Sequence, residues 1–279
     1  MKWLQQLRTE VYQHKYAINA KLLGDSSELA WSNLGYWSET HQTYPDACRA
    51  LADHLAHNVQ LTTSDHVLDL GCGQGASLLH WQQQYQIQHI EAVELQPKYI
   101  QKIQTAIPQL KAIHGHSFLN LKQISFQQAF DVVLCIDAAY HSSLNSFLNS
   151  VAPVLNSKGR LGFHYLILSP KFLNLNVAEK IQLALLLKAA DVNLKNLSDE
   201  VAVQQQLVQA GFEQIQIEDF SEAVLGGFSQ YIQQQTIAPQ TEAQYTAFDV
   251  MKIQLTAKLC QKLWTQGVVQ YVQVTAQKK

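Results

Sequence analysis

The sequence predicts an α/β fold with a doubly wound, mostly parallel sheet of seven strands. Apolar strand patterns alternate with helical patterns from about residue 45 onward. Strands separated by helices imply right-handed parallel crossovers, with helices on both faces of the sheet. One buried strand, His66 to Leu70, runs directly into a glycine-rich loop and then into a helical pattern. Open α/β sheets place their ligands at such a carboxyl end of a strand, so we expect a binding site there.

The patterns of residues 45–168 follow one another without a break. Apolar residues spaced four apart after Pro45 predict a helix over Asp46 to Val59. An apolar run over Phe130 to Ile136 is typical of a strand that is covered on both faces. The other elements expected here are the helix Ser77 to Tyr85, a helix that Pro97 opens, the helix Leu144 to Val151, the strands His89 to Glu94, Lys111 to His114 and Arg160 to Leu168, and a turn at Asn156 to Gly159.

After Ser169 the alternation is interrupted. Lys171 to Asn196 reads as an inserted helical segment. The elements expected beyond it are a helix over Asp199 to Ala210 that Gly211 ends, a strand over Phe212 to Phe220, a helix over Thr241 to Thr265 and a last strand over Val268 to Thr275. No Pro/Gly/Ser-rich linker divides the chain, which predicts a single domain over residues 1–279 with a helical cap insert at residues 171–197.

Composition excludes several classes of function. The 279 residues carry a net charge of −2 without a dense Lys/Arg stripe, so we expect no nucleic-acid partner. The four cysteines form no CxxC pair and show no metal-ligand spacing, so we expect no metal and a reducing, cytoplasmic location. The longest apolar stretch, Ile181 to Ala190, is too short to span a membrane, and Met1 to Thr9 is not a signal peptide.

The glycine loop carries most of the functional information. Gly71, Gly73 and Gly75 follow the strand within five residues, and glycine lets a backbone approach a ligand closely. Gly71, Gly73 and Ala76 also fit the pattern of a dinucleotide-binding loop. The loop alone therefore leaves two classes of nucleotide-like cofactor open, and an NAD(P)-dependent oxidoreductase is an alternative.

Two acidic residues accompany the loop. Asp69 lies two residues before the first glycine, where a carboxylate can organise the loop and face a cationic amino group of the ligand. Glu94 ends the next strand, where a carboxylate can accept hydrogen bonds from both ribose hydroxyls. Glu94 fits either cofactor, whereas Asp69 favours S-adenosylmethionine (SAM).

These residues resemble the class I SAM-dependent methyltransferases. Leu68 to Gly75 resembles their motif I, and Val93-Glu94 resembles their ribose-binding acidic position. Further similar segments are Phe130 to Asp137 and Gly159 to Phe163 for the fourth and fifth strands, Gln209 to Phe212 for the turn before the sixth, and Tyr271 to Lys278 for the antiparallel seventh. The resemblance covers residues 45–279. It implies a Rossmann-like fold, SAM as cofactor, and methyl transfer to an O, C or N atom of a small metabolite, hydrophobic metabolites included.

A narrower resemblance lies near the N-terminus. Asn33 to Trp37 is similar to the HxGYW-like segment of the small-molecule branch, which includes tocopherol, sterol and sugar methyltransferases. It implies that residues 1–44 form a lid over the cofactor and that Tyr36 lies on the cofactor side, unless Tyr36 and Trp37 merely pack the N-terminal helix. Asn33 replaces the usual histidine.

The family's Gly-Asp after the third strand is also altered. Here Gly115 is followed by His116 and Ser117. His116 is expected either beside the adenine or as a surface loop histidine, and backbone groups around Ser117 are the other candidate for the contact. Leu95 is a further predicted cofactor-binding residue. A histidine cannot reproduce the carboxylate that meets the adenine amino group. The two departures favour a further alternative, a catalytically inactive protein that binds SAM and serves as a partner or regulator.

Candidate catalytic residues follow the fourth strand. Methyl transfer from a sulfonium is an in-line displacement, in which the enzyme aligns the reactants and can remove a proton from the acceptor. His141 resembles the histidine that ends an ExxxH-like motif of the small-molecule branch, and we expect it to act as a base or to orient the substrate. Tyr140 is a second catalytic candidate as a pocket wall, and Asp137 is expected beside the methionine end of the cofactor or the substrate.

Two further features stay open at this point. His164 lies on an apolar strand, where we expect a core or pocket-edge histidine. The cap insert either packs on the domain or forms a hydrophobic roof over the substrate. Neither the acceptor nor the oligomeric state follows from the sequence.

Overall fold

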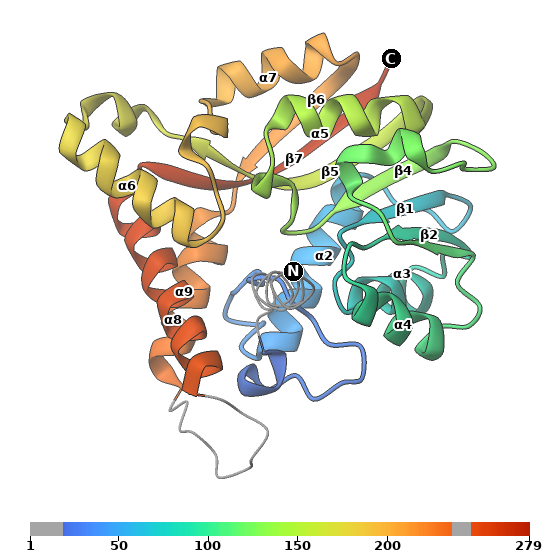
Figure 1. Cartoon of the computed structure of the whole chain (residues 1–279), viewed down its shortest axis with the longest axis horizontal. Coiled ribbons are helices and arrows are strands. Elements are labelled where there is room, and N and C mark those ends of the chain that lie inside the picture. Colours follow the sequence, from blue (N-terminus) through green and yellow to red (C-terminus); the bar gives the residue numbers. More distant parts are fainter. Residues whose placement is uncertain (1–18, 236–246) are drawn as a thin grey trace, which may run out of the picture.

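The computed structural model describes residues 19–235 and 247–279. Within them, seven strands form one sheet in the order β3-β2-β1-β4-β5-β7-β6 (Figure 1). The strands are β1 His66–Leu70, β2 His89–Val93, β3 Ala112–His114, β4 Phe130–Cys135, β5 Leu155–Leu168, β6 Phe212–Asp219 and β7 Val269–Lys278. The pairs among β1 to β5 are parallel, and β7 runs antiparallel to both β5 and β6. The predicted doubly wound, mostly parallel sheet is confirmed.

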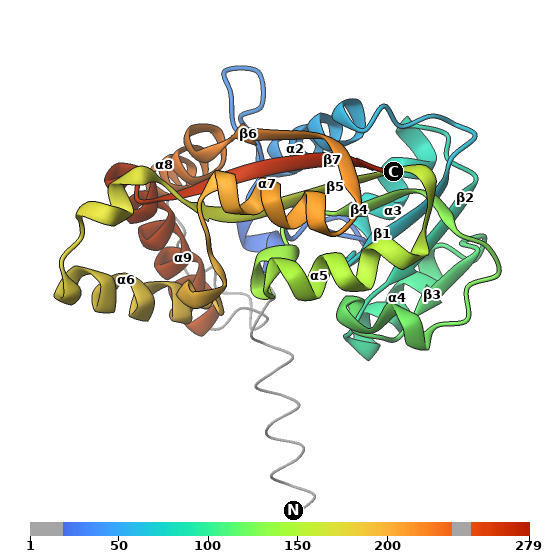
Figure 2. The ribbon, with the colours of Figure 1, turned by 90° about the horizontal axis from the view of Figure 1, so that it is seen from above.

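Helices cover both faces of the sheet. Those described are α2 Tyr44–Asn58, α3 Ala76–Gln84, α4 Pro97–Ala106, α5 Leu144–Val151, α6 Val177–Ala189, α7 Glu200–Gln209, α8 Gly227–Gln234 and α9 Ala247–Gln266. Figure 2 shows α2 on one face and α5 with α7 on the other. The central strands β1 and β4 are almost completely buried between these layers, which explains their uninterrupted apolar sequences.

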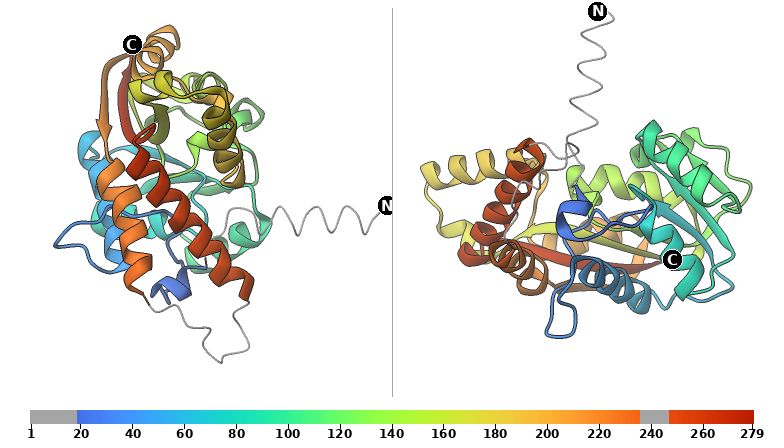
Figure 3. Two further views of the ribbon diagram at one scale, coloured as in Figure 1. Left: turned by 90° about the vertical axis from the view of Figure 1, so that its left-hand side faces the viewer. Right: turned by 90° about the horizontal axis from the view of Figure 1, so that it is seen from below.

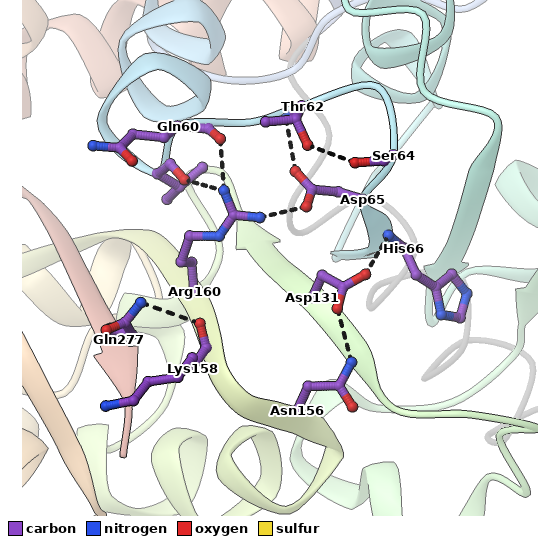
Figure 4. A network of polar contacts seen from close by, with 11 residues as sticks. Gln60, Thr62, Ser64, Asp65, His66, Asp131, Asn156, Lys158, Arg160 and Gln277 are labelled. Carbon is purple, nitrogen blue, oxygen red and sulfur yellow. Dashed lines mark hydrogen bonds and ion pairs between the residues drawn. The ribbon is translucent and has the colours of Figure 1, made fainter.

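A polar network fixes the amino ends of the central strands (Figure 4). The Arg160 guanidinium pairs with the Asp65 carboxylate and also donates to two carbonyl oxygens just after α2, at 2.9 and 2.6 Å. Asp131 accepts from the backbone N–H of His66 at 3.0 Å and from the Asn156 amide at 2.8 Å. These bonds tie β1, β4 and β5 together at the edge opposite to their carboxyl ends.

Two predicted boundaries near β5 and α9 need correction. β5 already begins at Leu155, so the turn predicted at Asn156 to Gly159 is instead an irregularity within the strand. Lys158 has a φ of 64° there, and the pairing with β4 shifts register between Phe130 and Val132. The helix predicted over 241–265 is described from Ala247, and residues 241–246 lie outside the described residues.

The helical region that precedes α9 was not predicted. A π-helical turn over Glu222–Gly226 continues into α8, and α8 lies side by side with α9 (Figure 3). Gly226 and Gly227 disfavour a helix by intrinsic propensity. Each glycine is needed for close packing instead: a Cβ would lie 3.0 Å from the Trp264 ring at Gly226 and 2.3 Å from Trp37 at Gly227. Tertiary packing therefore overrides the local preference.

The cap insert is confirmed as helical but is buried on one side only. Its helix α6 opens with a capping box between Asn176 and Glu179 and buries Leu183 and Leu187. Four large apolar side chains of the cap are more than half exposed: Leu173, Val177, Ile181 and Leu185. The cap therefore presents an apolar face that no described residue covers. No helix in the described part of the chain combines the length and apolarity needed to cross a bilayer.

Candidate active site

A cavity of about 530 Å³ lies at the carboxyl ends of β1, β2 and β4. The strand order reverses between β1 and β4, and ligands of open α/β sheets bind at such a switch point. Nine of the predicted site residues line the cavity: Asp69, Gly71, Gly73, Glu94, Leu95, His116, Ser117, Asp137 and His141. Three predicted residues, Tyr36, Gly75 and Tyr140, do not line it.

The glycine loop combines a left-handed backbone with close contacts. Gly71, Gly73 and Gly75 have φ values of 68°, 55° and 94°, a region that side chains disfavour. A Cβ at Gly73 would lie 2.8 Å from the Ser32 hydroxyl, so the loop leaves room for the N-terminal segment to cross it. A Cβ at Gly75 would lie 2.7 Å from Ile103, so Gly75 serves the packing of α4 and not the cavity wall.

Asp69 is a buried carboxylate without a cationic partner in the cavity wall. Its side chain accepts a hydrogen bond from the Trp81 indole at 2.7 Å and another from Ser77, and only 1% of the residue is exposed. Burial raises the pKa of Asp69 to about 6. No Lys or Arg among the described residues lines the cavity. The site is therefore prepared for a cationic group of a ligand.

Glu94 connects the end of β2 to the glycine loop. Its carboxylate accepts from the Gly73 N–H at 2.9 Å and from the Gln96 N–H at 2.8 Å. Burial raises the pKa of Glu94 above its usual value, although these backbone hydrogen bonds act in the opposite direction. A carboxylate offers about four acceptor positions, and backbone N–H groups of Gly73, Gln96 and Leu95 use three, so Glu94 can still accept from a ligand hydroxyl.

Asp137 attaches the N-terminal segment to the sheet. It has a φ of 56°, and its carboxylate accepts from the Leu34 N–H at 2.8 Å and from the hydroxyls of Tyr140 and Tyr271 at 3.0 and 2.8 Å. Burial is the main reason that the pKa of Asp137 is raised. Tyr140 thus lies behind the cavity wall, where its hydroxyl binds Asp137. The centroids of the Tyr140 and His141 rings are 4.6 Å apart.

The N-terminal segment, expected to form a lid, supplies cavity residues that were not among the predicted site residues. Residues 30–33 line the cavity, and the Asp25 carboxylate fixes them by accepting from the Trp31 N–H at 2.7 Å. The Asn33 carbonyl accepts from the Tyr44 hydroxyl at 2.9 Å. This segment has no regular periodicity, so the GYW-like residues next to it were the available signal. Residues 1–18 of the expected lid lie outside the described residues.

Tyr36 lies away from the cavity. Its ring packs 4.1 Å from His54 and 5.0 Å from Phe220. Trp37 stacks on Tyr231 at 4.3 Å and donates from its indole to the Leu34 carbonyl. Both aromatic residues pack the N-terminal segment against the fold, and the structure does not bring Tyr36 to the expected cofactor side.

His116 and Ser117 follow β3 and face the cavity. The loop is held by a hydrogen bond from the His116 N–H to the His114 carbonyl at 3.0 Å. The Ser117 side chain accepts from the Leu119 N–H at 3.3 Å, at the start of the following 3-10 helix. Both residues line the cavity, as does Leu95, which follows the neighbouring strand β2.

His141 lines the cavity and also contacts the segment that follows the cap helix α6. Its Nδ1 lies 3.3 Å from the Asp191 carbonyl oxygen, and Asp191 follows α6. A carbonyl oxygen can only accept, so this bond requires the proton on Nδ1 and makes Nε2 the basic nitrogen of the neutral ring. His164 differs: it is fully buried, stacks on Tyr271 and does not line the cavity, and burial lowers its pKa to about 3.

Comparisons with known proteins agree with this geometry. Residues 67–159 match the family described as a methyltransferase domain. Erythromycin 3''-O-methyltransferase of Saccharopolyspora erythraea is 33% identical over 75 residues, which are 27% of this chain and 24% of that relative. The chain therefore spans about a quarter of the length of this curated relative. For residues 67–159, this match agrees with the methyltransferase resemblance predicted from the sequence.

Solved structures extend the similarity of fold to the whole chain. A mycolic acid cyclopropane synthase, solved with S-adenosylhomocysteine (SAH), has a TM-score of 0.72 at 16% identity and covers 97% of this chain and 98% of its own. Geranyl diphosphate C-methyltransferase from Streptomyces coelicolor A3(2), also solved with SAH, has a TM-score of 0.72 at 13% identity. The similarity covers 99% of this chain and 98% of that protein's chain. The fold is thus that of these proteins.

Proposed function

We propose that the chain is a SAM-dependent methyltransferase that acts on a small molecule. The observation that carries the proposal is the cavity at the glycine loop, with carboxylates at Asp69 and Glu94 and no Lys or Arg in its described wall. SAM carries a cationic amino group and a cationic sulfur, which such a wall favours. A dinucleotide carries a diphosphate, which buried carboxylates repel. The charge of the cavity therefore favours SAM over NAD(P).

The predicted roles fit the positions in the cavity. Asp69 would hold the amino group and Glu94 the ribose hydroxyls, while Leu95, His116 and Ser117 would surround the adenine. Asp137 contributes by holding the N-terminal segment over the loop at Leu34. The segment covers the cavity, and a covered site excludes water from the reaction.

The protein's part in the chemistry is alignment and proton removal. SAM supplies a methyl group on a positively charged sulfur. His141 lines the cavity, and its basic Nε2 can take the proton that an O or C acceptor loses. Tyr140 acts as a positioning residue through its contacts with Asp137 and His141. The acceptor is a small molecule. The cap approaches the site at the Asp191 carbonyl, which contacts His141, while no residue of 171–197 is among those that line the cavity.

The lid, the cap and the cellular location complete the proposal. Residues 1–44 would act as a lid and residues 171–197 as a cap of one domain over residues 1–279. The four cysteines are unpaired and buried, which supports a cytoplasmic location.

Ligand binding tests the proposed cofactor. SAH at about 100 times its dissociation constant should stabilise the purified protein by about 2.7 kcal/mol, while NADH should produce no shift. Thermal unfolding in the presence of each ligand measures both effects. A shift with NADH and none with SAH would contradict the proposal. A screen of metabolites with a labelled methyl donor then separates an enzyme from a protein that only binds SAM.

Glu94 offers a second test of the cofactor site. Because Glu94 also accepts from the Gly73 N–H, Glu94→Gln is a milder change than Glu94→Ala. We expect Glu94→Gln to weaken SAH binding by roughly 1.5–3 kcal/mol, since charge-assisted hydrogen bonds to the ribose are lost, without unfolding the domain. Isothermal titration calorimetry measures the affinity and circular dichroism the fold. Unchanged affinity would remove Glu94 from the site.

A further inference from the structure

The cap helix α6 ends in a left-handed residue that is not glycine. Asp191 has a φ of 58°, and the N–H groups of Asp191 and Val192 donate to the carbonyl oxygens of Lys188 and Leu187 at 3.0 and 2.9 Å. These two bonds form a Schellman motif, in which the left-handed residue is usually glycine and sometimes asparagine. Val192 is buried and anchors the turn. The backbone of Asp191 therefore has one defined direction.

This turn directs the Asp191 carbonyl oxygen at His141. The oxygen lies 3.3 Å from His141 Nδ1. A second contact fixes the two segments relative to each other. The hydroxyl of Tyr165, a fully buried residue of β5, lies 2.9 Å from the Ser142 carbonyl oxygen and 3.4 Å from the Asn196 carbonyl oxygen. The residue after His141 and the end of the cap are thus held at the same buried hydroxyl.

The position of the imidazole proton decides what His141 can do. A neutral imidazole carries one N–H, and the hydrogen bond made by one nitrogen sets which of the two is protonated. With Nδ1 donating to the Asp191 carbonyl, Nε2 keeps the lone pair that takes up a proton. If the carbonyl were displaced, the ring could hold its proton on Nε2, which would then no longer act as a base. No residue of 171–197 lines the cavity, so the cap reaches the site through this contact.

We propose that Asp191 is a positioning residue for His141, whose left-handed backbone holds its carbonyl oxygen against Nδ1 and keeps Nε2 as the basic nitrogen. The inference rests on the proposed function, in which His141 is the base. It gives the end of α6, and not the exposed apolar face of the cap, a part in the chemistry. It also states which residues the position accepts, because Asn and Gly adopt the left-handed conformation readily and the β-branched Val does not.

The tautomer of His141 can be measured without an acceptor. Spectra that correlate ring nitrogens with ring protons, in protein labelled with ¹⁵N-histidine, distinguish a protonated from an unprotonated nitrogen, and His141→Ala identifies the His141 signals. At a pH where the ring is neutral, we expect the wild type to carry the proton on Nδ1. Asp191→Val should shift the proton toward Nε2, and Asp191→Gly and Asp191→Asn should restore the wild-type pattern.

Gln86→Val is the matched control for the strain that valine introduces. Gln86 is also left-handed, with a φ of 55°, and lies just after α3, but it does not line the cavity. Valine at this position should cost stability in the same way, because a β-branched residue is unfavourable at positive φ. It should leave the tautomer of His141 as it is in the wild type.

Turnover should follow the tautomer. With the acceptor found by the metabolite screen, we expect Asp191→Val to lower turnover at least about tenfold, a part of the roughly 10²–10⁴-fold that a positioned base contributes. SAH affinity, measured by calorimetry, should stay unchanged. Asp191→Gly and Asp191→Asn should rescue turnover, and Gln86→Val should keep the wild-type rate.

Three results would overturn the proposal. One is a wild-type His141 with its proton on Nε2, a measurement that needs no variant. Another is an unchanged tautomer and turnover in Asp191→Val. The third is an equal loss in the Val, Gly and Asn variants, which would assign the effect to the Asp191 carboxylate. If Asp191→Val does not fold, Asp191→Ala is measured with the same expected direction. Failure of the proposed function has a different signature, because the wild type would then not bind SAH, whereas His141 would still carry its proton on Nδ1.

Discussion

Asp69→Asn is expected to stabilise the ligand-free protein and to weaken SAH binding about a hundredfold. Burial raises the pKa of Asp69 to about 6 in the folded protein, against about 3.9 in an unfolded chain. Keeping the ionised carboxylate buried therefore costs stability above pH 6. Asparagine removes this cost and can still accept from the Trp81 indole. A gain of about 1–3 kcal/mol in the free energy of unfolding at pH 8 follows.

The loss of affinity has the same origin. A buried carboxylate next to a cationic amino group contributes a charge-assisted hydrogen bond, and a hundredfold loss corresponds to about 2.7 kcal/mol. Urea unfolding and calorimetry with SAH measure the two quantities. Asp65→Asn is a suitable control, because Asp65 pairs with Arg160 away from the cavity. It should lower stability and leave SAH affinity unchanged, the opposite pattern in both respects.

The contribution of Asp69 to stability and to SAH affinity should change with pH in opposite directions. The folded state binds this proton more tightly than the unfolded state, so the contribution of Asp69 to stability is complete below about pH 4 and is lost as the pH rises to about 6. SAH affinity should rise over the same interval as Asp69 ionises. Asp69→Asn should lack both changes. A variant that is less stable than the wild type, or binds SAH equally well, would contradict the assigned role.

The sequence predicted the fold well because the main signals are local. The buried run at Phe130–Cys135 and the glycine loop after Leu70 need no tertiary knowledge to be recognised. α8 was missed because Gly226 and Gly227 are selected by the proximity of Trp264 and Trp37, which only the folded chain reveals. The early start of β5 was missed because its irregular residues around Lys158 look like a turn.

For the site, too, features with a local sequence signal were predictable, whereas features that depend on tertiary packing were not. Residues attached to strand ends, such as Asp69, Glu94 and His141, were found because the carboxyl edge of the sheet follows from the strand order. Residues 30–33 belong to the expected lid but were not predicted as site residues, because their position depends on long-range hydrogen bonds, as from the Leu34 N–H to Asp137 across 103 residues.

His141→Ala is expected to lower turnover at least roughly tenfold while SAH affinity stays nearly unchanged. His141 lines the cavity after β4, and the Asp191 carbonyl fixes the proton on Nδ1, so Nε2 is the nitrogen that can accept a proton. Positioned general bases contribute about 10²–10⁴-fold, and the true acceptor sets where in this range the effect lies. His89→Ala, an exposed histidine at the start of β2, is the control and should keep wild-type turnover.

The pH profile separates a base from a packing residue. Only a neutral imidazole accepts a proton, so wild-type turnover should fall once acid protonates His141, and the variant should lack this fall. Steady-state kinetics with the identified acceptor give the turnover, and calorimetry gives SAH affinity. A neutral amine acceptor needs less help from a base, so a small effect would point to N-methylation. A wild-type rate and pH profile in His141→Ala would remove His141 from the mechanism. Parallel losses of turnover and SAH affinity would assign His141 to cofactor binding instead.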